Sequence, residues 1–162
     1  MRRHAALVGM LLVAAAPCVA ADGFNVAGFS RATTMDELKA RFPTSSFADN
    51  YVYVSDADAR DHVYGVQIPG RSPSNPLRLT FERPAERTKS HRPEYPACAT
   101  LESAVKRAYG APSRVRDFME EQSQNHELTW ERDGELLTLA CFRMGKGAYL
   151  AEALSIWAKE VR

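Results

Sequence analysis

Residues 127–142 have the sequence ELTWERDGELLTLACF, and this stretch gives the clearest indication of the fold. Asp133-Gly134 stands between two strand patterns, which is a strong signal for a two-residue hairpin turn. A second tight turn at 145–147 leads to a third strand at 149–157, whose two faces are both rather apolar. The segment therefore predicts a three-stranded antiparallel meander, and its last strand is expected to be central or covered by a helix.

Two short amphipathic helices are predicted upstream of this meander, at 34–42 and 100–109. Thr34 and Glu37 form a capping box at the first helix, and a proline ends it. The second helix has apolar residues at helical spacing and is followed by Gly110, a typical residue just past a helix end. The stretches MDELKARFPTS and LESAVKRAYGAPS therefore have the same shape: a short helix, an aromatic residue at its end, and a turn.

Strands are predicted after each helix, at 51–54, 62–68 and 77–81, and then at 114–119, 127–131, 136–142 and 149–157. The order of one helix followed by three or four strands thus occurs twice. It predicts an α+β fold with an antiparallel sheet and two short helices on one face. We expect a tandem pseudo-repeat with units at about 30–82 and 97–158. The length of 162 residues fits a single domain over 22–162.

The first 21 residues have the pattern of a secretory signal peptide. Arg2 and Arg3 precede an apolar run at 5–16, which small residues follow. This run is shorter than the roughly 20 residues that span a bilayer, and no later stretch is apolar enough to enter one. We therefore expect removal of 1–21, a formal net charge that changes from +1 to −1, and a periplasmic or secreted protein. An uncleaved anchor and a lipoprotein acylated at Cys18 are the alternatives.

Cys98 and Cys141 remain after signal removal, and an isolated pair in an exported chain favours a disulfide bond. The bridge would connect the second helix to a strand and contribute roughly 3–4 kcal/mol in the chain-entropy model. The alternative is that Cys98 is a reactive nucleophile, which requires a free thiolate and a nearby base.

Composition and motifs argue against several functional classes. With 45% hydrophobic and 25% charged residues the chain is ordinary for a globular protein, and its balanced charge does not indicate nucleic-acid binding. The segment 56–61, DADARD, begins like a calcium loop but lacks the required glycine and the glutamate at position 12. His62, His91 and His126 have no zinc-ligand spacing. We expect no metal and no cofactor.

The sequence contains no recognisable catalytic motif. There is no nucleophile elbow, P-loop, dinucleotide fingerprint or HExxH helix. Glu120 and Glu121 are adjacent, so in a strand they would point to opposite faces and could not cooperate as an acid pair. We therefore expect no catalytic residues and a protein that is not an enzyme, although dispersed catalytic groups stay open as an alternative.

Candidate partner-binding residues lie on one strand and in two loops. Tyr51 and Tyr53 share a face, and they would be exposed if the valines between and after them face the core. Half-burial of the tyrosines is the alternative. The loops at 69–76 and 82–97 carry the other candidates, and a solvated linker is the alternative for the second loop. These other candidates are Arg71, Arg87 and Arg92.

The segments TTMDELKARFP and LESAVKRAYGAPS resemble the short helix motif of BamE/SmpA-like envelope proteins, and two such units resemble the β-lactamase-inhibitor-protein-like architecture. This resemblance implies an exported, non-catalytic domain whose sheet or loops contact a protein partner. We therefore expect a protein-binding module (an inhibitor, an immunity protein or an envelope accessory protein) with an envelope or secreted protein as partner and no nucleic acid. The alternatives are a small-ligand carrier with a pocket between helix and sheet, and a hydrolase without a recognisable motif.

Overall fold

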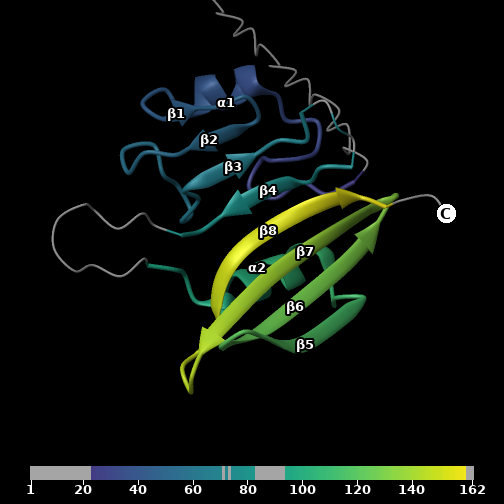
Figure 1. Cartoon of the computed structure of the whole chain (residues 1–162). Helices are drawn as coiled ribbons and strands as arrows, with labels where there is room; N and C mark the ends of the chain where they lie inside the picture. Colours follow the sequence, from purple (N-terminus) through teal and green to yellow (C-terminus); the bar gives the residue numbers. More distant parts are fainter. Residues whose placement is uncertain (1–22, 71, 73, 83–93, 160–162) are drawn as a thin grey trace, which may run out of the picture.

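An antiparallel sheet of eight strands forms the framework of the described chain (Figure 1). The computed structural model describes residues 23–70, 72, 74–82 and 94–159. The predicted signal segment 1–21 and the candidate residues Arg71, Arg87 and Arg92 lie outside these ranges. Within them the elements are α1 (Met35–Arg41), β1 (Ser46–Phe47), β2 (Tyr51–Tyr53), β3 (Gly65–Gln67), β4 (Leu77–Thr80), α2 (Cys98–Tyr109), β5 (Arg114–Glu120), β6 (Ser123–Arg132), β7 (Glu135–Met144) and β8 (Leu150–Ala158).

The strand order is β1-β2-β3-β4-β8-β7-β6-β5, so each half of the chain forms a meander and the two meanders join at their last strands. β4 and β8 pair antiparallel at this junction, with Leu79 opposite Leu154. Each half consists of one helix followed by four strands, which is the order that a pseudo-repeat requires. Superposition of the two halves stays a prediction.

One face of the sheet carries the core. A continuous row of buried aliphatic side chains crosses six strands, from β2 to β6. Leu38 of α1 and Val105 of α2 are buried in the same cluster, so both helices cover this face, as expected from the sequence. The row consists of Val52, Val66, Leu79, Leu154, Leu139 and Leu128.

Local signals account for the start of α1 and the end of α2. The capping box is present: Thr34 N donates to Glu37 Oε2 at 2.7 Å, and Glu37 N donates to Thr34 Oγ1 at 3.3 Å. Helix α2 starts at Cys98, two residues before the predicted 100. Its N-cap residue Ala97 makes no side-chain cap hydrogen bond, and Cys98 N donates to Tyr149 O at 2.9 Å instead. It ends before Gly110, which has a φ of 83°.

The structure corrects several sequence expectations around turns. The predicted strand at 62–68 is reduced to β3, because Asp61 and His62 adopt positive φ angles of 52° and 62° in a turn. His62 therefore lies outside the strand. Glu120 and Glu121 do not share a strand either, since Glu121 has a φ of 52° in the turn between β5 and β6.

Two further differences concern weakly apolar strands. β6 begins at Ser123 instead of 127, because its polar first residues pair with both neighbouring strands and need no apolar pattern. His126 consequently lies inside β6 and not before it. β1 was not predicted, since only its two residues pair with β2.

Candidate binding surface

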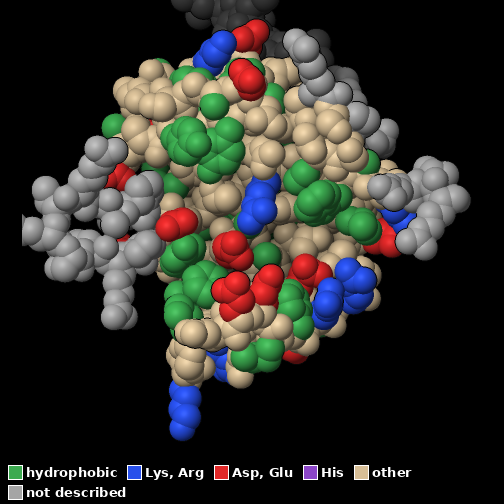
Figure 2. Space-filling model, in the orientation of Figure 1, with side chains coloured by type: hydrophobic (Ala, Val, Ile, Leu, Met, Phe, Trp, Pro, Cys, Tyr) green, Lys and Arg blue, Asp and Glu red, His purple; other side chains and the backbone are tan. Residues whose placement is uncertain are grey.

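The face of the sheet opposite the helices is the candidate binding surface, and we call it the open face. In Figure 1 α2 lies behind β7 and β8, so Figure 2 shows the open face from the same side. Neither described helix covers it, because both pack on the core side. Across β2, β3, β4, β8, β7 and β6 its two central rows contain Tyr53, Gly65, Thr80, Ala153, Ala140 and Glu127, and Tyr51, Gln67, Arg78, Ser155, Thr138 and Thr129.

The tyrosine pair of β2 forms an ordered aromatic cluster on the open face. Val52 and Val54 are buried, so both tyrosines point away from the core. Tyr53 is 62% exposed, as expected for an exposed pair, whereas Tyr51 is half-buried, as the alternative expected. Their ring centroids are 4.6 Å apart. Whether this cluster binds a partner stays a prediction.

Gly65 allows Tyr51 to lie flat on the sheet. The Tyr51 hydroxyl reaches across β3 and lies 3.1 Å from Thr80 Oγ1 on β4. A Cβ atom at Gly65 would overlap both oxygens, so a side chain there is incompatible with this arrangement. The sequence contained one signal for this close approach, a glycine inside a strand pattern.

Charged side chains surround the middle of the open face. Arg78 lies 3.6 Å from Glu152, and Arg114 lies 3.7 Å from Glu127. Figure 2 shows acidic side chains gathered beside a central basic one, with separate hydrophobic groups around them. Trp157 adds a partly exposed ring at 38%. The surface therefore combines tyrosine, tryptophan and arginine, which are enriched at protein interfaces, with a group of acidic side chains.

A shallow pocket of about 370 Å³ lies between the open face and the segment that precedes α2. Tyr95 packs edge-on against Phe142, with 5.0 Å between ring centroids. Burial, together with the neighbouring carboxylate of Glu82, raises the pKa of the Tyr95 hydroxyl to about 12. Three glutamates line the pocket, but in the described ranges no group of three His, Cys, Asp or Glu side chains could hold a metal ion.

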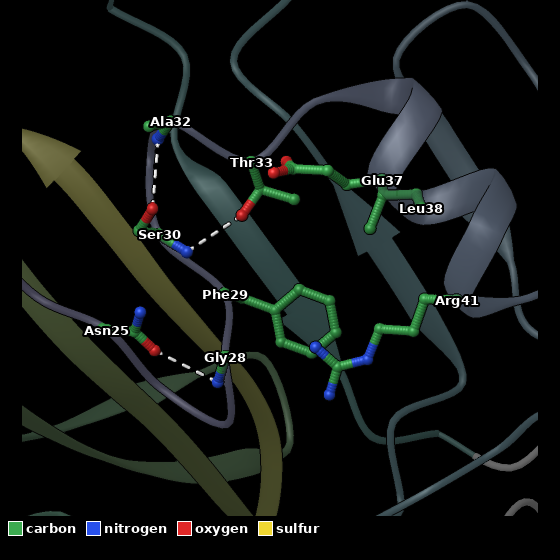
Figure 3. Close-up of a pocket in the computed structure, with 9 residues that line it drawn as sticks. All are labelled: Asn25, Gly28, Phe29, Ser30, Ala32, Thr33, Glu37, Leu38 and Arg41. Carbon is green, nitrogen blue, oxygen red and sulfur yellow. Dashed lines mark hydrogen bonds between the residues drawn. The ribbon is translucent and has the colours of Figure 1, made fainter. Parts of the chain in front are cut away.

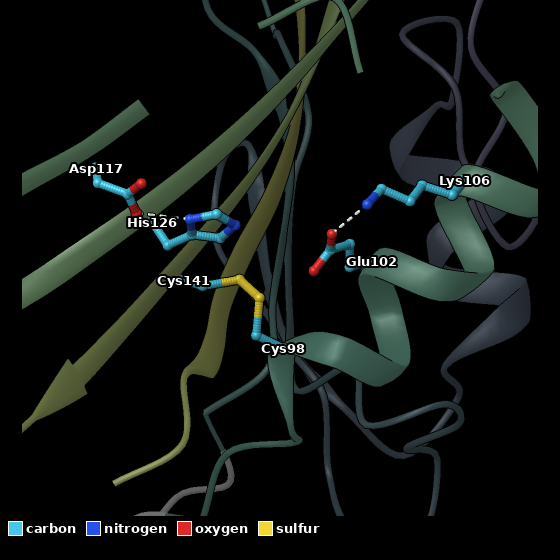
Figure 4. The surroundings of a disulfide bond; sticks show 6 residues. All are labelled: Cys98, Glu102, Lys106, Asp117, His126 and Cys141. Carbon is cyan, nitrogen blue, oxygen red and sulfur yellow. Dashed lines mark hydrogen bonds and ion pairs between the residues drawn. A yellow bond between two sulfur atoms is a disulfide. The ribbon is translucent and has the colours of Figure 1, made fainter. Parts of the chain in front are cut away.

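The predicted disulfide is confirmed. Cys98 at the start of α2 is bonded to Cys141 of β7, with a Cα–Cα distance of 5.9 Å (Figure 4). His126 lies opposite Cys141 in the sheet register, and its Nδ1 is 2.8 Å from Asp117 Oδ1. This row of aspartate, histidine and cysteine supplies no nucleophile while the disulfide is intact, because both sulfurs are in the bond and neither is a thiolate.

An apolar groove of about 620 Å³ runs along α2. Leu101 and Val105 of the helix, Val26 of the N-terminal segment and Leu154 of β8 contribute apolar walls, and His62 lies among its polar lining residues. The groove lies between helix and sheet, where a pocket was expected for a small-ligand carrier. Its volume and apolar lining are within the range of small-molecule sites.

A second pocket, of about 300 Å³, lies between the N-terminal segment and α1 (Figure 3). Arg41 lies over the Phe29 ring, 4.0 Å from its centroid, and donates to Ala27 O at 2.8 Å. Glu37 is engaged in the capping box. Arg41 and Glu37 are therefore both bound by other groups of the protein, and the Arg41 contacts hold the N-terminal segment against α1.

Comparison with family models, with curated proteins and with solved structures finds no match for this chain. Within the described ranges, no helix combines the length and apolarity needed to cross a bilayer. The fold therefore defines the class of the protein as α+β, with one helix-covered face and one open face.

Proposed function

We propose that this chain is an exported, non-catalytic protein-binding module that contacts its partner through the open face of the sheet. The observation that carries the proposal is the tyrosine cluster. Tyr53 is largely exposed on a strand whose backbone is paired on both sides, and Tyr51 is held beneath it across Gly65. A large aromatic side chain that is positioned before binding loses little conformational freedom in a complex.

The proposed partner is another envelope or secreted protein, and the module would act as an inhibitor, an immunity protein or an envelope accessory protein. The resemblance to BamE/SmpA-like and β-lactamase-inhibitor-protein-like domains supports this class of partner. The disulfide is compatible with an oxidising compartment. Arg71, Arg87 and Arg92 remain candidate contacts in the two loops.

Affinity capture from envelope extract with the mature chain, followed by titration of the captured protein, tests the proposal. Tyr53→Ala should weaken binding about thirtyfold if Tyr53 is a hot spot. The same variant should leave the melting temperature nearly unchanged, because the side chain is 62% exposed. Met119→Ala is the matched control, since Met119 is 63% exposed but lies on the other face of the sheet. Undiminished affinity of Tyr53→Ala, or turnover of a substrate by the pure protein, would contradict the proposal.

The groove along α2 supports a second candidate function, a carrier of a small apolar ligand. A fluorescent fatty acid such as cis-parinaric acid is a suitable probe, because it matches the volume and the apolar lining of the groove. Ala104→Phe would fill the groove and should abolish the fluorescence increase. Ala99→Phe is the control, because Ala99 is an exposed residue of the same helix that does not line the groove. Equal fluorescence with both variants would reject the groove as a ligand site.

A further inference from the structure

The last strand of the sheet, β5, has an accessible outer edge. It runs for seven residues without proline, and all of them except Phe118 are exposed. Val115 is 52% and Met119 is 63% exposed. In the described ranges β5 pairs only with β6, so its other side has no strand partner. Long exposed edges are templates for pairing with another strand.

The register of the hairpin determines which backbone groups are unpaired. A two-residue turn at 121–122 connects Glu120 to Ser123, so these two residues exchange backbone hydrogen bonds and the bonded positions then alternate along β5. Even-numbered residues of β5 thus bond β6. The N–H and C=O groups of Val115, Asp117 and Met119 point away from the sheet.

We propose that a second copy of this chain pairs with this edge, antiparallel, with the twofold axis at Asp117. This register places Arg114 opposite Glu120 of the second copy and Val115 opposite Met119 of the second copy. Arg116 then faces Phe118 of the second copy. Each of these pairs occurs twice in the dimer because of the symmetry. The inference goes beyond the proposed function, since it uses an edge of the sheet and not its open face.

The side chains of β5 are complementary to themselves in this register. Arg114 and Glu120 lie on the open face and have opposite charges, whereas Val115 and Met119 lie on the other face and are both apolar. Arg116 lies over the Phe118 ring of its own chain at 4.5 Å, a geometry in which a guanidinium and an aromatic face can attract each other. Opposite-charge and apolar cross-strand pairs stabilise antiparallel sheets.

One pair opposes the dimer. Asp117 would face Asp117 of the second copy, and directly opposed like charges are unfavourable. Each Asp117 carboxylate also contacts His126 Nδ1 of its own chain, at 2.8 Å. The pair therefore supplies a specific test, because removal of the charge at Asp117 should strengthen association.

Shifted registers are less complementary. Moving the axis to Phe118 retains only five facing residues, from Arg116 to Glu120, and leaves Arg114 and Val115 opposite the turn. The other end of the sheet cannot substitute for β5, since β1 has only two residues.

Sedimentation equilibrium of the mature chain over a range of concentrations measures the association. We expect a concentration-dependent dimer that Asp117→Asn tightens several-fold. Arg114→Glu and Glu120→Arg should each weaken it about tenfold, because each reversal affects two pairs in the dimer. The double variant Arg114→Glu/Glu120→Arg should restore dimerisation. Arg132→Glu is the control, since Arg132 is exposed on the neighbouring strand.

Circular dichroism of each variant establishes that it is folded. A monomer for both the wild type and Asp117→Asn at millimolar concentration would overturn the proposal. Binding of this edge to a strand of another protein, without self-association, would overturn it as well. Rescue of Glu120→Arg by Arg116→Glu, in place of Arg114→Glu, would show that the proposed register is wrong.

Discussion

Tyr51 lies flat across Gly65, and its hydroxyl group reaches Thr80 Oγ1 at 3.1 Å on the next strand. The absence of a side chain at Gly65 is thus what determines where the aromatic ring lies on the open face. Tyr53 packs on that ring, so the exposed residue of the pair also depends on the glycine. If a partner binds at these tyrosines, substitution of Gly65 should therefore weaken binding even though Gly65 itself does not contact the partner.

Gly65→Ala should displace Tyr51 and destabilise the protein by about 1–3 kcal/mol, the usual effect of an added group in a packed site. Urea unfolding monitored by circular dichroism measures the change. In a Tyr51→Ala background the same substitution should cost less, because one of the two overlapping oxygens is absent. An equal cost in both backgrounds would show that Tyr51 is not the group displaced.

Loss of the disulfide should lower the free energy of unfolding. The bond closes a loop with a sequence separation of 43 residues. The double variant Cys98→Ala/Cys141→Ala should lose about 2–4 kcal/mol, as is typical for bridges of this kind. Intact mass after alkylation, with and without reduction, provides the companion measurement. Two cysteines that alkylate freely in the native protein would contradict the bond.

Asp58 should contribute stability at neutral pH that disappears in acid. Desolvation opposes ionisation of this carboxyl group, but hydrogen bonds from Ser45 Oγ and from Thr44 N, both at 2.7 Å, outweigh it and lower its pKa below 3.8. When a carboxyl group has a lower pKa in the folded than in the unfolded state, its charge stabilises the fold at pH values above the unfolded pKa. This stabilisation is lost as the pH falls through the folded pKa.

Asp58→Asn should accordingly lower the melting temperature at pH 7, and the difference from the wild type should shrink as the pH falls below about 4. Thermal unfolding at a series of pH values tests this. Asp49→Asn, at an exposed position, is the control. A difference that is constant from pH 7 to pH 2 would mean that the charge of Asp58 does not stabilise the fold.

Tyr95 should ionise only in strong base. Burial raises its pKa to about 12, and the negative charge of Glu82 acts in the same direction. Absorbance at 295 nm, taken as the difference between wild type and Tyr95→Phe, should show this titration near pH 12 while the far-ultraviolet spectrum still reports a folded chain. A difference spectrum that titrates near pH 10 would refute burial of the hydroxyl.

The raised pKa of Tyr95 should also make the stability of the protein depend on pH. The folded pKa of Tyr95 exceeds that of an unfolded tyrosine, so its stabilising effect is complete below pH 10 and is lost between about pH 10 and 12. Urea unfolding in this range should show a steeper loss for the wild type than for Tyr95→Phe. Parallel losses would indicate that the hydroxyl is solvated in the folded state.

The candidate surface was only partly predictable from the sequence. Alternation of valine and tyrosine in 51–54 indicated correctly that the two residue types lie on opposite faces of the sheet, because side chains alternate along any strand. It left open which face is buried, and the structure shows that the valines face the core. The roles of Gly65, Thr80 and Trp157 were missed. Their positions beside the tyrosines, or on the same face, follow from strand pairing, and the pairing partners cannot be identified from a local pattern.

What the sequence determined by itself is local. The Asp133-Gly134 turn has the positive φ angles, 48° and 77°, that such a turn requires, and the capping box of α1 forms within four residues. The disulfide could be predicted because only two cysteines lie outside the predicted signal segment. Only the tertiary structure decided that β4 pairs with β8, which places Leu79 beside Leu154. That junction depends on burying one continuous apolar face under both helices, a condition on the whole chain that no short segment contains.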